Sequence, residues 1–425
     1  MKLPLPSQIR VLERGWLSSN NILFLEGSQA TLVDSGYVSH APQTLALVRE
    51  ALAGRRLARI INSHSHSDHI GGNAALQREF GCGITVPAGI AEAVAAWDED
   101  FLMLRPSGQR GERFLHDATL SAGDEFELAG LSWRALPAPG HDMEALVFHC
   151  ASRRLLISGD ALWRDGFGIQ FAEVMGLAPG LAATRATLEA IGRLEVDLVI
   201  PGHGAPFAEF DDAMERAMRR VAAFEEDPSR MARNALKACF TFNLLELRRL
   251  RRDALADYLS GISFFDDVNT RLLHLSPGAL ADWLLGELLR ARVVALQDDY
   301  IVPTQNASGL LRGSQPKFQP HQRRTCGQCM AFAPRRFPGK RDQTGMFKWG
   351  NSHPGSLADR MRDGVAAGED IAGHEAADGN EDAGEEGGPE TGDLETSNQR
   401  RDEQDHQGVD DQDEKPEGDD GGGES

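Results

Sequence analysis

Short apolar runs alternate with amphipathic segments over the first 226 residues, and polar or glycine-rich turns separate them. Compact apolar runs predict buried strands, and apolar positions spaced three and four apart predict helices. We expect strands at 9–12, 21–24, 30–33, 57–61, 84–86, 124–128, 131–136, 146–150, 155–157 and 197–200, with helices at 41–53, 72–80, 89–96 and 181–194. Two mixed sheets with helices outside, an αββα sandwich of the α+β class, suit this order and bring many strand ends to one rim.

A different pattern fills residues 229–303. Helices are expected at 231–251, 252–259 and 276–290, followed by two strand-like runs at 293–297 and 300–302. This order is typical of a small winged-helix-like domain. Its last helix carries two acidic residues and one basic residue over 280–290, so attraction to nucleic-acid phosphates would be weak. A lid or dimerisation role, with a homodimer as the corresponding assembly, is therefore favoured over DNA binding.

The charge of the chain is concentrated at its C-terminal end. The 425 residues carry a net charge of -20, and residues 351–425 hold 24 acidic and 5 basic residues. This segment is poor in apolar residues and predicts a disordered acidic tail. Residues 304–350 predict a basic linker that contains Cys326-Gly327-Gln328-Cys329, a weak zinc or redox signal for which unstructured thiols are the favoured interpretation. The rest of the chain, residues 1–350, carries a net charge of -1 and is nearly neutral.

The chain lacks the features of exported and membrane-spanning proteins. The opening residues, Met1 to Pro6, break off before an apolar signal region forms, and no apolar run reaches the roughly 18–20 residues of a membrane helix. Five cysteines, an odd number, do not describe a disulfide framework. We therefore expect a cytoplasmic protein with no membrane partner.

Candidate chemistry gathers in the stretch His64-Ser65-His66-Ser67-Asp68-His69, between a predicted strand and a predicted helix. Imidazole and carboxylate are ligands for zinc and, with less selectivity, for iron or manganese. The alternative is a solvated turn rich in serine and histidine. The metal interpretation is favoured because His141, Asp160 and His203 each follow a short apolar segment and adjoin glycine or proline, where a chain leaves a sheet.

These residues and Asp34, in Val33-Asp34-Ser35-Gly36, resemble the metallo-β-lactamase superfamily over about residues 8–226. The resemblance implies that His64, His66 and His141 bind one divalent cation, that Asp68, His69 and His203 bind a second, and that Asp160 bridges them. Zinc is the first expectation, with iron or manganese as alternatives. Asp160 replaces the cysteine of true zinc β-lactamases, and His66 replaces the glutamate of flavodiiron proteins. The glyoxalase II, lactonase and phosphodiesterase branches remain, and the 229–303 pattern resembles a winged helix appended to some of these hydrolases.

Water between two divalent cations can have its pKa lowered from about 15.7 to about 7, which supplies hydroxide near neutral pH. We therefore predict a hydrolase that attacks an ester, thioester or lactone of a small-molecule acyl substrate with metal-bound hydroxide. Asp68 is predicted to pass a proton, and Asp34 either orients the histidine loop or caps a turn. Alternatives are a mononuclear iron persulfide dioxygenase and a nucleic-acid-binding phosphodiesterase; nucleic acid is the disfavoured partner.

Two loops near the predicted rim are rich in apolar side chains. The first holds Trp97, Phe101, Met103 and Leu104, and the second holds Trp163, Phe167, Phe171 and Met175. They either hold an acyl group and exclude water or pack onto the sandwich.

Overall fold

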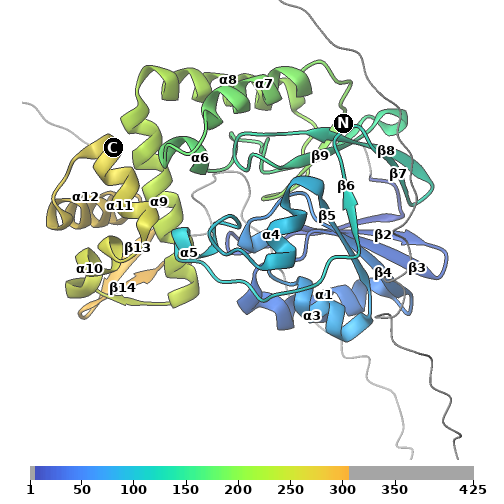
Figure 1. Cartoon of the computed structure of the whole chain (residues 1–425), viewed down its shortest axis with the longest axis horizontal. Helices are drawn as coiled ribbons and strands as arrows, with labels where there is room; N and C mark the ends of the chain where they lie inside the picture. Colours follow the sequence, from blue (N-terminus) through green and yellow to red (C-terminus); the bar gives the residue numbers. More distant parts are fainter. Residues whose placement is uncertain (1–4, 306–425) are drawn as a thin grey trace, which may run out of the picture. The chain divides into compact units, whose positions relative to one another are not determined.

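The computed structural model describes residues 5–305, so the predicted acidic tail and most of the predicted linker, with Cys326 and Cys329, lie outside the described residues. Two sheets form the centre (Figure 1). The first has the order β1 (Ile9–Leu12), β2 (Asn21–Glu26), β3 (Gln29–Val33), β4 (Arg56–Ile61), β5 (Gly83–Pro87) and β6 (Ala118–Leu120). The second has the order β11 (Leu198–Pro201), β10 (Leu155–Gly159), β9 (Leu146–Cys150), β8 (Leu131–Pro137) and β7 (Glu125–Leu128).

Both sheets mix strand directions. Strands β3 to β6 are parallel and β1 to β3 antiparallel, while in the second sheet only β10 and β11 are parallel. The carboxyl ends of β3, β4, β10 and β11 lead into the loops of the candidate site. The predicted sandwich of mixed sheets is confirmed.

Successive residues of a strand point to opposite faces of its sheet. In the central strands both sets of side chains are buried, one set against the other sheet and the other set under the outer helices. In β2, Ile22 and Phe24 join the cluster between the sheets, whereas Leu23 and Leu25 join the cluster under the outer helices. In β10, Ile157 faces the other sheet and Leu156 faces the helices of the second layer. This explains why the sequence shows continuous apolar runs rather than alternation.

Helices cover both outer faces (Figure 1). On the first sheet lie α1 (Ala41–Leu52), α3 (Asn73–Phe80) and α4 (Ala91–Ala96). The second sheet is covered by α7 (Gly180–Ile191) and α8 (Phe210–Glu226). Helix α3 ends at Gly81, whose φ of 58° forms a left-handed cap. Helix α8 and strand β6 were not predicted.

The chain continues beyond α8 into α9 (Pro228–Leu247), β12 (Leu250–Arg251), α10 (Leu255–Ser260), α11 (Ser263–Val268), α12 (Pro277–Arg290), β13 (Val294–Gln297) and β14 (Tyr300–Pro303). The predicted helix 231–251 is wrong at its end, because Arg248 takes a φ of 69° and Leu250–Arg251 pairs with β14. The three strands form a sheet in the order β12-β14-β13. The winged-helix assignment and the domain boundaries stay predictions. Within residues 5–305, no helix has the length and apolar character needed to span a bilayer.

Candidate metal centre

The seven predicted ligand residues meet at one rim of the sandwich, and each is at most 8 % exposed. His64 and His66 lie in the loop after β4, and Asp68 and His69 in the short helix α2 (Ser67–Ile70) that follows. His141 lies between β8 and β9, Asp160 directly follows β10, and His203 follows β11. Strands distant in sequence therefore deliver these side chains to one place.

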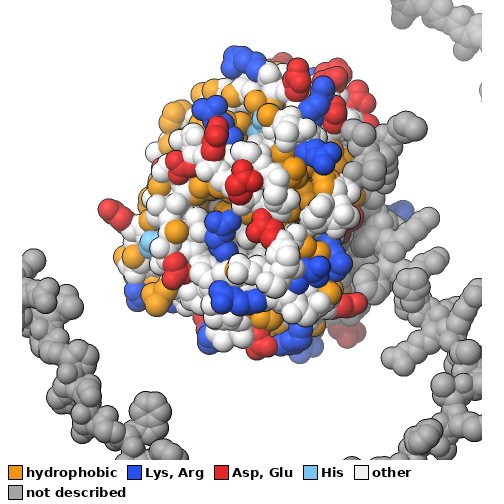
Figure 2. Space-filling model, turned by 90° about the vertical axis from the view of Figure 1, so that its right-hand side faces the viewer, with side chains coloured by type: hydrophobic (Ala, Val, Ile, Leu, Met, Phe, Trp, Pro, Cys, Tyr) orange, Lys and Arg blue, Asp and Glu red, His pale blue; other side chains and the backbone are white. Residues whose placement is uncertain are grey.

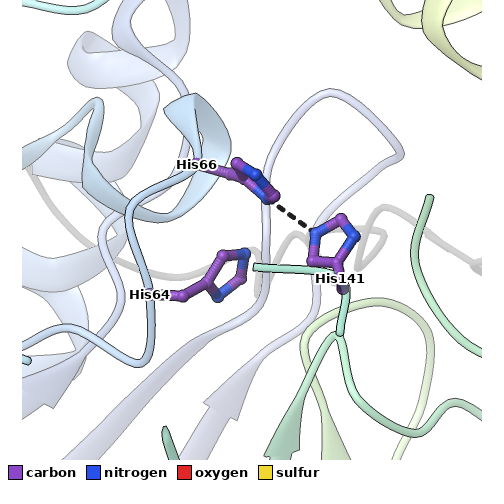
Figure 3. Close-up of side chains that lie close together, drawn as sticks. All are labelled: His64, His66 and His141. Atoms are coloured by element: carbon purple, nitrogen blue, oxygen red, sulfur yellow. Dashed lines mark hydrogen bonds between the residues drawn. The ribbon is translucent and has the colours of Figure 1, made fainter. Parts of the chain in front are cut away.

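Three overlapping groups of these residues have ligand atoms within 4.8 Å of one another: His64, His66 and His141; His64, His69 and Asp160; and Asp68, His69 and His203. The first group is shown in Figure 3, where His66 Nδ1 lies 2.6 Å from His141 Nε2. Asp160 lies between the sets, with Oδ2 3.4 Å from His141 Nε2 and 3.7 Å from His203 Nε2. The arrangement could hold one or two cations.

Hydrogen bonds fix the tautomers of three histidines so that a lone pair faces the site. His69 Nδ1 donates to Asp34 Oδ2 over 2.8 Å, and His141 Nδ1 donates to the Ile169 carbonyl over 2.5 Å. Ser63 Oγ donates to Asp34 Oδ2, which leaves it to accept from His64 Nδ1 at 3.0 Å. The opposite nitrogens, His64 Nε2 and His69 Nε2, are buried and have no hydrogen-bond partner within the described part of the chain. Buried ring nitrogens that make no hydrogen bond fit a metal ion.

The electrostatics fit a cation as well. Burial, reinforced by neighbouring histidines, lowers the pKa of His64 well below its ordinary value and that of His66 to about 3, so both stay neutral as metal binding requires. Burial opposes ionisation of Asp160, but the charges of His203 and His69 hold its pKa well below the usual range. Burial likewise opposes charging of His69, yet Asp34, Asp68 and Asp160 raise its pKa well above normal. A cation would replace that proton.

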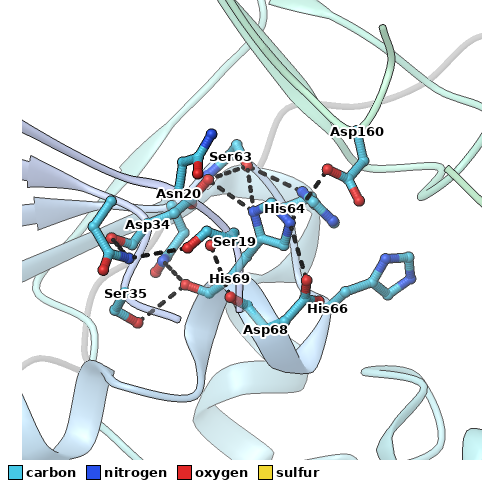
Figure 4. A network of polar contacts seen from close by, with 12 residues as sticks. Ser19, Asn20, Asp34, Ser35, Ser63, His64, His66, Asp68, His69 and Asp160 are labelled. Carbon is cyan, nitrogen blue, oxygen red and sulfur yellow. Dashed lines mark hydrogen bonds and ion pairs between the residues drawn. The ribbon is translucent and has the colours of Figure 1, made fainter. Parts of the chain in front are cut away.

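Asp34 supports the histidine loop from the end of β3 (Figure 4). Its Oδ1 accepts from Ser63 N over 2.9 Å, and its Oδ2 accepts from Ser63 Oγ and His69 Nδ1, both over 2.8 Å. The residue is 2 % exposed and has a φ of 59°, which aspartate tolerates better than most side chains. Of the two sequence-based interpretations of Asp34, the geometry favours the orienting one.

Asp142 has an equivalent position on the other side of the loop, although the sequence analysis gave it no role. Its Oδ2 accepts from Ser65 N over 3.0 Å and from Ser65 Oγ over 2.6 Å. Burial raises its pKa, but His66 and the Ser65 hydrogen bonds lower it overall, so the carboxylate stays charged. The sequence feature that could have identified Asp142 is its position directly after His141, where the chain has left a strand.

Two glycines allow the close approach of backbone to ligands. A Cβ at Gly168 would lie 2.4 Å from His141 Nδ1, and one at Gly202 would lie 2.2 Å from Asp160 Oδ1. Both distances are shorter than any contact that a side chain tolerates, so only glycine fits.

Aromatic side chains border the site. Trp16 and Trp163 lie 5.0 and 5.4 Å from the His203 ring, and Phe171 lies 5.0 Å from that of His66, measured between ring centroids. Trp163 Nε1 also donates to Asp160 Oδ1 over 3.1 Å. The first predicted apolar loop differs: Trp97 packs on Phe114, and Leu104 is buried in the outer core. Trp16 was missed, because it lies far from the metal motif in sequence.

Sequence comparisons agree with this geometry. Residues 14–203 match the family described as Metallo-beta-lactamase superfamily. A hydroxyacylglutathione hydrolase of Methylococcus capsulatus is 31% identical over 166 residues, which are 39% of this chain and 54% of that protein. A hydroxyacylglutathione hydrolase of Rhizobium etli is 26% identical over 132 residues, which are 31% of this chain and 44% of that protein. The chain thus spans about half the length of these curated relatives.

Similarity to solved structures is weaker. A metallo-beta-lactamase from Cronobacter sakazakii, a HARLDQ motif mutant, is 20% identical and has a TM-score of 0.43, covering 53% of this chain and 95% of that chain. A metallo-beta-lactamase family protein from Thermus thermophilus is 19% identical with a TM-score of 0.41, covering 71% of this chain and all of that chain.

Proposed function

Since residues 14–203 form a domain of the metallo-beta-lactamase superfamily, we propose that this protein is a metal-dependent hydrolase with two divalent cations that cleaves a thioester, or a related ester or lactone. The convergence of seven buried histidine and aspartate side chains carries the proposal. The relatives named as hydroxyacylglutathione hydrolases support the thioester as the first substrate class to test.

In this proposal His64, His66 and His141 would hold one cation, and Asp68, His69 and His203 would hold the other. Asp160, whose carboxylate lies close to both groups, would contribute a ligand oxygen. The nitrogen and carboxylate ligands favour zinc, with iron or manganese as alternatives.

When bound, such cations lower the pKa of water toward neutrality and polarise the carbonyl oxygen that is attacked. Asp68 supplies the proton transfer. Burial opposes its ionisation, but His69 and the hydrogen bond with His203 lower its pKa overall, so it is ionised at neutral pH. Its Oδ2 lies 2.9 Å from His203 Nε2. There it can accept the proton that the attacking water loses and return it to the departing thiolate.

Of the aromatic side chains beside the ligand residues, Trp16 is the one that supports an acyl substrate. Trp163 and Phe171 are only 5 % and 6 % exposed, so they pack inside the protein and leave little surface for a ligand. Trp16 is partly exposed. An apolar acyl group packed against its ring would exclude water from the carbonyl.

The test uses the purified full-length chain loaded with zinc, manganese or iron in turn. Metal content is measured by mass spectrometry, and thioester cleavage by the thiol that is released. We expect a double variant, His66→Ala with Asp160→Ala, to lose metal and activity together. His116→Ala, which changes a histidine outside the site, is the matched control. Near-full activity of the double variant would refute the proposal.

The metal content, together with two further measurements, separates the alternatives. One iron per chain with oxygen uptake on a persulfide would favour the dioxygenase. Salt-dependent retention on DNA or RNA would favour the phosphodiesterase. On the face shown in Figure 2, basic and acidic side chains are interspersed rather than gathered by sign, which gives no support to a nucleic-acid surface there.

A further inference from the structure

A cleft of about 830 Å³ lies between α8 and α9, and none of its lining residues is a candidate metal ligand. Four of its side chains are cationic: Arg220, Arg230, Arg233 and Lys237. Two are acidic, Glu226 and Asp227. The lining therefore has an excess of positive charge.

Arg220 is the unusual member of this set. Its guanidinium lies 5.1 Å from the ring centroid of Phe167 and 5.3 Å from that of Phe224, and it makes no ion pair or hydrogen bond with any residue in the range 5–305. Neighbouring arginines of α8 are paired, Arg216 with Asp165 at 3.5 Å and Arg219 with Glu215. Burial lowers the pKa of Arg220 to about 10. A desolvated charge without a counterion is costly.

The two acidic residues of the cleft form no ion pair with Arg220 in the described part of the chain. Asp227 caps α9, where its carboxylate accepts from Ser229 N at 3.0 Å and from Arg230 N. Lys237 pairs with Glu287 at 3.3 Å, but Arg230 has no ion pair with any of the described residues. With Lys237 paired, three cationic side chains of the lining, Arg220, Arg230 and Arg233, face the two carboxylates of Glu226 and Asp227.

We propose that this cleft binds a phosphate-type polyanion, such as a diphosphate or a small phosphorylated molecule. Guanidinium groups match phosphate oxygens with two parallel hydrogen bonds, and a bound anion would offset the desolvation of Arg220. The cleft is large enough for more than one phosphoryl group.

The site is tested by calorimetric titration of the metal-loaded full chain with inorganic pyrophosphate at fixed ionic strength. Arg230→Glu changes an exposed position at the rim of the cleft, so it leaves the core intact. We expect it to weaken binding at least about tenfold, since it removes one charge-assisted contact and adds repulsion. Arg219→Glu makes the same charge change on α8 outside the cleft and should leave binding within about twofold.

Two results would overturn the inference. One is equal affinity in the Arg230→Glu and Arg219→Glu variants, or no binding by the unaltered chain. The other is binding that disappears in the His66→Ala, Asp160→Ala variant, because pyrophosphate would then occupy the metal centre instead. Binding that survives loss of the metal ligands and fails in Arg230→Glu supports the cleft.

Discussion

Asp34→Asn is the sharpest single test of how the metal centre is held. The substitution preserves shape, and the amide oxygen can still accept from Ser63 N. The amide nitrogen cannot accept from His69 Nδ1, which now donates to Asp34 Oδ2 over 2.8 Å. His69 must then move its proton to Nε2, the nitrogen that faces the site with no hydrogen-bond partner among residues 5–305. A protonated Nε2 cannot bind a metal ion.

The expected loss follows from what Asp34 does in the fold. Losing an orienting partner of a ligand histidine typically weakens metal affinity about 10- to 100-fold, and breaking a buried hydrogen bond to a charged group costs about 1.5–3 kcal/mol of stability. Zinc affinity is measured by competition with a coloured chelator, and stability by urea unfolding. Asp117→Asn is the control, because Asp117 accepts from Ile84 N over 2.8 Å far from the site. Wild-type zinc affinity in Asp34→Asn would refute the tautomer argument.

Three further changes have definite expected outcomes. Gly168→Ala would place a methyl group 2.4 Å from His141 Nδ1, so the proposed thioester cleavage should fall at least about tenfold, whereas Gly278→Ala, with open space around it, should not reduce it. Removing the metal with a chelator should lower the melting temperature. A metal ion whose concentration is about 100 times its dissociation constant stabilises the folded state by about 2.7 kcal/mol, so an unchanged melting curve would count against a bound ion. Phe264→Ala empties a fully buried position whose ring lies 5.3 Å from Phe171, so unfolding should become easier by about 3–5 kcal/mol, and a loss below about 1 kcal/mol would show that the contact is unimportant.

The sandwich could be predicted because its signals are local. Each central strand is a short apolar run, and each turn carries glycine, proline or a polar pair, so element order alone narrows the layer architecture. The ligand residues could be singled out for the same reason, since His64 to His69 are contiguous and His141, Asp160 and His203 each follow a strand. Their convergence depends only on the rule that strand ends share a rim.

The remaining features depend on distant contacts that no local pattern encodes. Trp16 lies beside His203 because Asn20 Nδ2 donates to the Pro201 carbonyl, a contact spanning 181 positions. The end of α9 at Leu247 was misplaced because Arg248 is a good helix former, and pairing of Leu250 with Ile301 overrides its preference. Strand β6 is three residues long and two of its positions are exposed, so it is too short to show the alternation of apolar and polar residues that predicts a strand.

One apolar cluster runs without a break from the second sheet into the C-terminal helices. It includes Val199 of β11, Val221 of α8, Phe240 of α9 and Leu284 of α12. A fragment ending at residue 226 would leave the inner sides of α6 (Phe171–Val174) and α8 open to water, and with them the support for Phe171 beside His66. Residues 227–305, about a quarter of the described chain, are therefore not a detachable appendage, and shortened versions of this protein should be insoluble before they are inactive.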